Sequence, residues 1–307
     1  MATLLWTQKQ DIGPATRHSF DLVYDVARSR VVGFGGQIGE TLARDTWEWD
    51  GENWTQMSDI GPPPRLGHAL AYDGTRQRTV LFGGTSKIGV IEALQFVLGD
   101  TWEWDGEAWT QVADTGPLPR AFHAMTYDSK RGRTLLFGGV VREKQGAFVN
   151  FADTWSWDGN EWTEQQDAGP PGRNGHRLVY DTLRDRAVLF GGVTNAKLVN
   201  DTWEHDGSLW TQMADTGPDP RVAYGMVYND ANTLLFGGFN FTDKFSDTWT
   251  WDGKHWTQRQ DIGPSKRSSH GMAYDPSRKR TVLFGGNSDQ DLGDTWEAFE
   301  RPRPKVV

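Results

Sequence analysis

Hydrophobic and polar positions along the chain follow one pattern that recurs six times. An apolar stretch ends in Phe-Gly-Gly, a variable segment follows, and an Asp-Thr-Trp triplet opens an alternating stretch such as TWEW. In the second copy the pattern predicts strands at 66–72, 79–82 and 101–104 and around Trp109, separated by turns rich in Asp and Gly. Each copy is therefore expected to form four short antiparallel strands.

Three landmarks define the repeat. The Phe-Gly-Gly triplets begin at Phe34, Phe82, Phe137, Phe190, Phe236 and Phe284. The Asp-Thr-Trp triplets begin at Asp45, Asp100, Asp153, Asp201, Asp247 and Asp294. An arginine precedes a tyrosine by seven residues at Arg17, Arg65, Arg120, Arg173, Arg221 and Arg267. A fixed period of this size is the signature of a repeat architecture.

The two ends of the chain complement each other. A Trp-Thr element, the centre of the expected fourth strand, follows every Asp-Thr-Trp triplet except the last, and the missing copy lies at the N-terminus around Trp6. Because an unpaired strand edge is a liability, strand 3–8 is expected to complete the last sheet. We predict an all-β fold, a single six-bladed β-propeller over 1–307, with blades of approximately 15–57, 63–112, 118–165, 171–213, 219–259 and 265–299 plus 3–8.

Composition fits this prediction and excludes several function classes. Trp, at 16 of 307 residues, and Gly, at 36, suit short strands with bulky rings between blades. The absence of cysteine excludes disulfides and thiol catalysis. A net charge of −9 argues against a nucleic-acid partner. No apolar run approaches the roughly 20 residues of a membrane helix, and no signal peptide is expected because the first residues are needed as a strand. We expect a soluble, cytoplasmic protein without a membrane partner.

The motifs resemble those of a known family. The double Gly after an apolar strand, the Tyr-Asp pair before it and the spaced tryptophans of DTWEWDGEAWT at 100–110 are similar to Kelch repeats, as in the central domain of galactose oxidase. The resemblance implies a propeller but leaves function open, since Kelch propellers include protein-binding adaptors, sugar-acid mutarotases and copper oxidases. Copper-radical oxidation is excluded because its Cys–Tyr crosslink needs a cysteine, and we expect no metal or other cofactor.

The connections predict where a site lies. Each first strand begins, and each second strand ends, at the same end of the blade, so the six arginines and the second-to-third loops share one mouth of the propeller. A pocket is expected on this side, with Arg17, Arg65, Arg120, Arg173, Arg221 and Arg267 binding an anionic ligand. Arginines of this type line the ligand mouth in the adaptors that the chain resembles. The alternative is architectural: each arginine bonds loop carbonyls, as its presence in all six copies suggests.

Residues three positions after each arginine form a second set. They are Phe20, His68, His123, His176, Tyr224 and His270. Blade faces look at the neighbouring blade, so packing between blades is the favoured interpretation of these rings, and the lack of a tight His/Asp/Glu cluster weakens a metal site. His68, His123, His176 and His270 also remain candidate ligand-binding residues at the mouth.

Departures from the repeat suggest chemistry. The position four residues after the arginine is Ala or Gly in four blades but Asp21 in the first and Arg177 in the fourth, which are opposite in the ring. Asp21 and the neighbouring His18 are candidate acid/base residues facing an anion bound by Arg177, with Tyr224 as a third catalytic candidate. The alternative is a solvated channel that tolerates two charges. His205 replaces the usual tryptophan on an outer strand and is expected to face solvent.

The second-to-third loops of blades two (85–99) and three (140–152) are the longest and are unusually apolar. They suggest a lid or wall over a partly apolar ligand, with Phe96, Phe148 and the adjacent Phe151 as contacts. A homodimer contact and mutual packing of the loops are the alternatives.

Two function classes remain. One is a module that binds a small acidic or partly apolar molecule, or an acidic peptide. The other is a metal-independent isomerase, cyclase or mutarotase.

Overall fold

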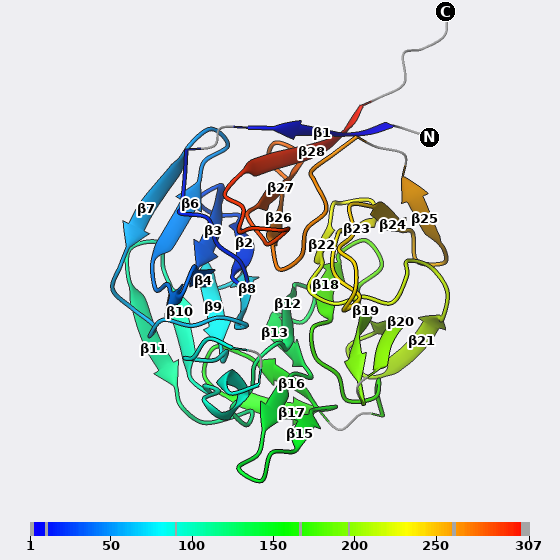
Figure 1. Cartoon of the computed structure of the whole chain (residues 1–307). Coiled ribbons are helices and arrows are strands. Elements are labelled where there is room, and N and C mark those ends of the chain that lie inside the picture. Colours follow the sequence, from blue (N-terminus) through cyan, green and yellow to red (C-terminus); the bar gives the residue numbers. More distant parts are fainter. Residues whose placement is uncertain are drawn as a thin grey trace, which may run out of the picture.

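The computed structural model describes residues 3–9, 12–89, 91–165, 168–195, 197–259 and 262–301. Six four-stranded antiparallel sheets stand around a central channel as the blades of a propeller (Figure 1). Successive innermost strands contact one another around the whole ring. The all-β, six-bladed fold predicted from the repeat is confirmed.

Each blade contributes four strands, counted from the channel outward. The innermost strands are β2 (Asp21–Asp25), β8 (Ala69–Asp73), β12 (Ala124–Asp128), β18 (Arg177–Asp181), β22 (Gly225–Tyr228) and β26 (Gly271–Asp275). The second strands are β3 (Arg30–Phe34), β9 (Arg78–Phe82), β13 (Arg133–Phe137), β19 (Arg186–Thr194), β23 (Thr233–Phe236) and β27 (Arg280–Phe284). The third strands are β6 (Thr46–Trp49), β10 (Thr101–Trp104), β16 (Thr154–Trp157), β20 (Lys197–His205), β24 (Thr248–Trp251) and β28 (Thr295–Arg301). The outer strands are β7 (Trp54–Ser58), β11 (Trp109–Ala113), β17 (Trp162–Gln165), β21 (Trp210–Ala214), β25 (Trp256–Arg259) and β1 (Thr3–Gln8).

The two faces of the disc carry different connections. The loop face carries the Gly-Gly pairs and the second-to-third connections, which contain β4 (Gln37–Ile38), β5 (Thr41–Leu42), the 3₁₀ turn η1 (Ala93–Gln95), β14 (Val140–Arg142) and β15 (Phe148–Asn150). The turn face carries the short turns between the innermost and second strands. Within the described ranges, no helix is long and apolar enough to cross a membrane.

The N-terminal strand closes the ring, as predicted. β1 pairs antiparallel with β28, from Thr3 opposite Arg301 to Gln8 opposite Trp296, and supplies the outer strand of the sixth blade (Figure 1). The indole of Trp6 donates a hydrogen bond to Thr248 of the fifth blade at 3.4 Å. Every other outer strand makes the equivalent bond to the preceding blade. The two chain ends therefore reproduce the contacts of an uninterrupted blade.

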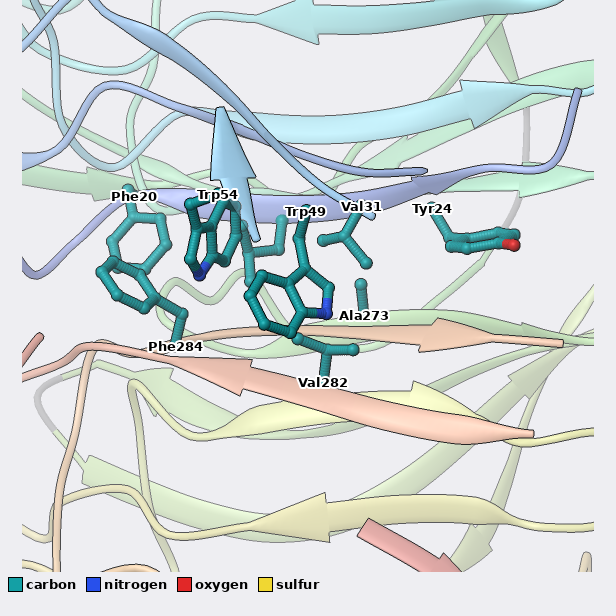
Figure 2. Close-up of a cluster of buried hydrophobic side chains, with 9 residues drawn as sticks. Phe20, Tyr24, Val31, Trp49, Trp54, Ala273, Val282 and Phe284 are labelled. Atoms are coloured by element: carbon teal, nitrogen blue, oxygen red, sulfur yellow. The ribbon is translucent and has the colours of Figure 1, made fainter. Parts of the chain in front are cut away.

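The core lies between blades. In Figure 2, Phe20, Trp49 and Trp54 of the first blade pack against Val282 and Phe284 of the sixth. The Trp54 and Phe284 ring centroids are 5.1 Å apart in a tilted arrangement. Burying such large rings is the dominant favourable term in folding, so each blade is stabilised chiefly by its neighbours.

The innermost strands begin later than their sequence pattern predicts. In the second blade the strand was expected from residue 66, but Leu66 makes only an isolated bridge to Thr85 and β8 begins at Ala69. Between them Gly67 takes a left-handed conformation, with φ of 64°. Its amide N–H donates to the Ser19 carbonyl of the first blade instead of to a strand.

This detour repeats in every blade and builds a closed ring of backbone hydrogen bonds. Each member has a positive φ and donates its N–H to the carbonyl of the member in the preceding blade, at 2.6 to 3.3 Å. The members are Ser19, Gly67, Phe122, Gly175, Ala223 and Ser269. The ring surrounds the channel on the loop-face side of the innermost strands.

Candidate functional site

The six repeat arginines lie inside the protein. Arg17 is 3 % exposed and the other five are 0 % exposed. Each guanidinium forms a bidentate ion pair with the aspartate of the same blade's Asp-Thr-Trp triplet, at 2.6 to 2.7 Å for one arm and 2.8 to 2.9 Å for the other. Each guanidinium also donates to two backbone carbonyls. One belongs to the first Gly of Gly-Gly, and the other to the residue two positions before the arginine.

These contacts support the architectural alternative for the arginines. Their donors hold the loops of their own blade, so they do not form the open positive ring expected at the mouth. Burial alone would raise the pKa of Asp45, but hydrogen bonds from Arg17 and Trp47 hold it below the ordinary value. The same holds for the pKa values of Asp100, Asp153, Asp201 and Asp294.

The four repeat histidines lie between blades, in agreement with the favoured interpretation. His68, His123, His176 and His270 are at most 5 % exposed. Each ring meets, edge to face, the Phe of the preceding blade's Phe-Gly-Gly at 5.4 to 5.6 Å between centroids. Burial and the nearby Arg120 lower the pKa of His123 to about 3. The pKa values of the other three lie well below 6.5 for the same reasons. The rings are therefore neutral at physiological pH.

Asp21 and Arg177 meet across the channel. The Nη1 atom of Arg177 lies 3.0 Å from Oδ1 of Asp21, although the residues belong to opposite blades. Asp21 also accepts hydrogen bonds from the backbone N–H groups of Leu22 at 3.1 Å and Leu70 at 2.9 Å. The charge of Asp21 is thus satisfied by three donors, so the two departures from the repeat form an ion pair.

Two of the three catalytic candidates, Asp21 and Tyr224, bind Arg177, whereas His18 has a different partner. Tyr224 is 0 % exposed, and its hydroxyl donates to the Phe190 carbonyl and accepts from the Arg177 backbone N–H at 3.0 Å. Burial raises the pKa of this hydroxyl. His18 faces Asp291 instead, with Nε2 3.7 Å from Oδ1, and burial lowers its pKa. Asp21 is thus paired with Arg177 while His18 faces Asp291, and the acid/base roles of these residues stay a prediction.

The central cavity opens on the face opposite to the expected one. A cavity of about 300 Å³ is lined by the innermost strands, with Asp21 and Arg177 at one end. Its other end is lined by Val26, Ser129 and Asp230 of the turn face. The lining includes none of the six repeat arginines, so the expectation of a pocket on the arginine side does not describe this cavity.

The two long loops lie on the loop face and pack on each other. Leu94 of η1 and Val140 of β14 are buried in one cluster, with Val97 and Phe122 packed against it. Mutual packing, one of the alternatives, therefore accounts for this apolar subset. Phe151 is also structural, since its ring lies 3.9 Å from the guanidinium carbon of Arg120.

A second subset of the loops is exposed. We define the two-loop surface as Lys87, Ile91, Phe96, Arg142 and Phe148. Ile91 is 47 % exposed, Phe96 48 % and Phe148 53 %. The Lys87 ammonium lies 5.7 Å from the Phe96 ring centroid, and the Arg142 guanidinium carbon lies 5.8 Å from that of Phe148. Each loop thus presents an exposed aromatic ring beside a cation.

The structure also bears on the position of His205 and on groups of metal-ligating side chains. His205 was expected in solvent but is 2 % exposed, and its ring packs 4.9 Å from that of Trp210, because it occupies the buried position that Trp104 and Trp157 fill elsewhere. In the part of the chain that the structure describes, no three His, Cys, Asp or Glu side chains are grouped so that they could hold a metal ion.

Comparison with known proteins addresses the family. A family model described as the KLHDC2/KLHL20/DRC7 Kelch-repeats domain matches residues 135–298. This segment is more than half of the chain and runs from within β13 of the third blade to within β28 of the sixth. A search of curated proteins found no match. Together with the six repeated four-stranded blades, the match places this chain in the Kelch-repeat β-propeller family.

Proposed function

We propose that this Kelch propeller is a binding module that docks an acidic, partly apolar peptide segment of a partner protein on its two-loop surface. Kelch propellers are generally protein-interaction scaffolds. The observation that carries the proposal is the pair of exposed aromatic rings, Phe96 and Phe148, each with a cation beside it. Exposed aromatic side chains of this kind are enriched at protein interfaces.

The rigid base under this surface supports the same function. Leu94 and Val140 anchor the two loops in a common apolar cluster. The Thr85 hydroxyl donates to the Ala93 carbonyl at 2.6 Å, which fixes the turn that carries Phe96. A surface held in place before binding loses less conformational entropy when a ligand docks.

Charge favours an acidic ligand. The two loops carry Lys87, Arg142 and Lys144 against Glu92 and Glu143, whereas the whole chain has a net charge of −9. The loops therefore carry an excess of one positive charge in an acidic protein, and the cations beside the exposed rings attract acidic segments. The apolar part of the ligand would cover Ile91 and the two phenylalanine rings.

A peptide-display selection tests the proposal. Random peptides selected on the wild-type protein should be enriched in acidic residues around an apolar residue. Their affinity should fall by about ten-fold or more in the Phe96→Ala/Phe148→Ala variant, since hot-spot aromatics contribute at this level. The matched control is Leu183→Ala, because Leu183 is 75 % exposed but lies on the turn face.

Two outcomes would contradict the proposal. One is a set of selected peptides without acidic enrichment, and the other is equal binding to wild type and the double variant. The dimer alternative uses the same side chains and is tested by sedimentation equilibrium. A wild-type dimer that becomes monomeric in Phe96→Ala/Phe148→Ala would assign the surface to self-association instead.

A further inference from the structure

The guanidinium of Arg177 has unused hydrogen-bonding capacity inside the channel. A guanidinium carries five N–H donors. The Nε–H of Arg177 donates to the Tyr224 carbonyl at 3.1 Å, and one Nη1–H donates to Asp21 at 3.0 Å. The remaining three N–H groups have no protein partner among the described residues, although the side chain is only 24 % exposed.

The same level of the channel offers backbone donors. The N–H groups of Leu22 and Leu70 point into the channel, because they donate to the Asp21 carboxylate. The other four blades have the same strand register at the equivalent residues, so their N–H groups face the channel as well. These residues are Met125, Leu178, Met226 and Met272.

The Asp21 side chain shows that this level of the channel binds a carboxylate. It sits between the Arg177 guanidinium and two backbone N–H groups, which are the donors that proteins use for carboxylates. No other blade supplies a charge at this position, since the equivalents are Ala69, Ala124, Gly225 and Gly271. The free N–H groups of the Arg177 guanidinium are therefore available to a second carboxylate.

The cavity limits the size and the route of such a ligand. Its volume of about 300 Å³ is at the small end of the range for ligand sites. Leu70, Met226 and Met272 contribute apolar surface to its wall. The lining includes turn-face residues such as Val26 and Asp230 but none of the members of the backbone ring, so a ligand enters from the turn face, away from the two-loop surface.

The geometry points to a small-molecule site at the centre of the propeller, separate from the two-loop surface. The ligand is a compact monocarboxylate with an apolar body. Its carboxylate binds the free N–H groups of Arg177, and its body lies along the channel wall toward the turn face. Arg177 is the anchoring residue, and the Asp21 carboxylate on the same guanidinium repels the negative charge of the ligand.

The test uses 4-fluorobenzoate as the probe and follows its binding by fluorine NMR. Wild-type protein should bind this anion in preference to the neutral 4-fluorobenzamide. Arg177→Met keeps the length of the side chain but removes its donors, and it should weaken binding by about ten-fold or more. Asp21→Asn keeps the shape and removes the repelling charge, so it should tighten binding by several-fold.

The opposite signs of the two variants keep the test independent of general damage to the fold. Equal affinity for the anion and the amide in Asp21→Asn, or unchanged affinity in Arg177→Met with native tryptophan fluorescence, would overturn the site. The Phe96→Ala/Phe148→Ala variant should bind the probe as wild type does. Loss of probe binding there would instead place the anion on the two-loop surface.

Discussion

The buried histidines predict a specific dependence of stability on pH, and His123 allows its size to be calculated. Its pKa is lowered to about 3 in the folded protein by burial and by Arg120. In the unfolded chain it returns to about 6.5. Below that value the unfolded state binds a proton that the folded state does not bind. Stability therefore falls as the pH decreases from about 6.5 toward about 3.

The magnitude follows from linkage. Between pH 7 and pH 5 the loss through His123 alone is about 2 kcal/mol in the free energy of unfolding. His123→Phe should remove this loss. Phenylalanine is a suitable replacement because Phe20 fills the equivalent position in the first blade, where it is 4 % exposed and packs 5.7 Å from Phe284.

Urea unfolding at pH 7, 6 and 5 tests this reasoning. Wild type should lose about 2 kcal/mol more than His123→Phe over this range, while the two proteins differ least at pH 7. The control is His255→Gln, which removes a solvent-exposed histidine in place of a buried one. Parallel pH profiles for wild type and His123→Phe would refute the assignment of a neutral buried ring.

Three further predictions concern the framework. Asp21→Asn and Arg177→Met should each lower the free energy of unfolding by roughly 3 kcal/mol, and the double variant should lose less than the sum; additive losses in urea titrations would mean that the cross-channel pair is uncoupled. Trp6→Ala should lower the free energy of unfolding by about 3–5 kcal/mol, as should the equivalent substitution Trp54→Ala in the first blade. A Trp6→Ala variant with the melting temperature of wild type would contradict ring closure by β1. Ala223→Gly should raise the free energy of unfolding by about 1 kcal/mol, since Ala223 has a φ of 55°; an unchanged denaturation midpoint would show that the backbone ring is not strained.

The blade architecture could be predicted because each strand signal occurs six times. One short apolar stretch such as 79–82 fits either a strand or a buried helix segment, but six copies bounded by the same turns indicate a strand. The displaced Trp6 element identified the closing strand for the same reason. The start of β8 was missed because the ring position is glycine in only two blades, and residues such as Phe122 and Ala223 give no sign of a positive φ.

The site was harder to predict because the partner of each arginine is remote in sequence. Arg65 binds Asp100, and the innermost strand, the second strand and the long loop lie between these two residues in the sequence. The signal was present, since the six aspartates of Asp-Thr-Trp are as uniform as the six arginines, and two uniform opposite charges at one end of a blade predict an ion pair. The cavity lies on the turn-face side of the backbone ring, which the side-chain pattern does not encode.

A departure from the repeat in one blade is accompanied by a departure in another blade. The junction of the fifth and sixth blades shows why. In five blades an arginine in the first turn lies against the Asp-Gly hairpin of the next blade, as Arg28 does against Gly106 and Arg278 against Gly51. The sixth blade has no such hairpin, because β1 supplies its outer strand from the other end of the chain. The fifth blade correspondingly has Asn-Asp-Ala-Asn at 229–232 and no arginine. Arg28 also forms ion pairs with Asp25 and Glu48 of its own blade. The fifth blade has Asn229 and Thr250 at these two positions, so the arginine is absent together with its carboxylate partners and the hairpin. By the same logic Asp21 and Arg177, two departures in opposite blades, are one feature of the channel.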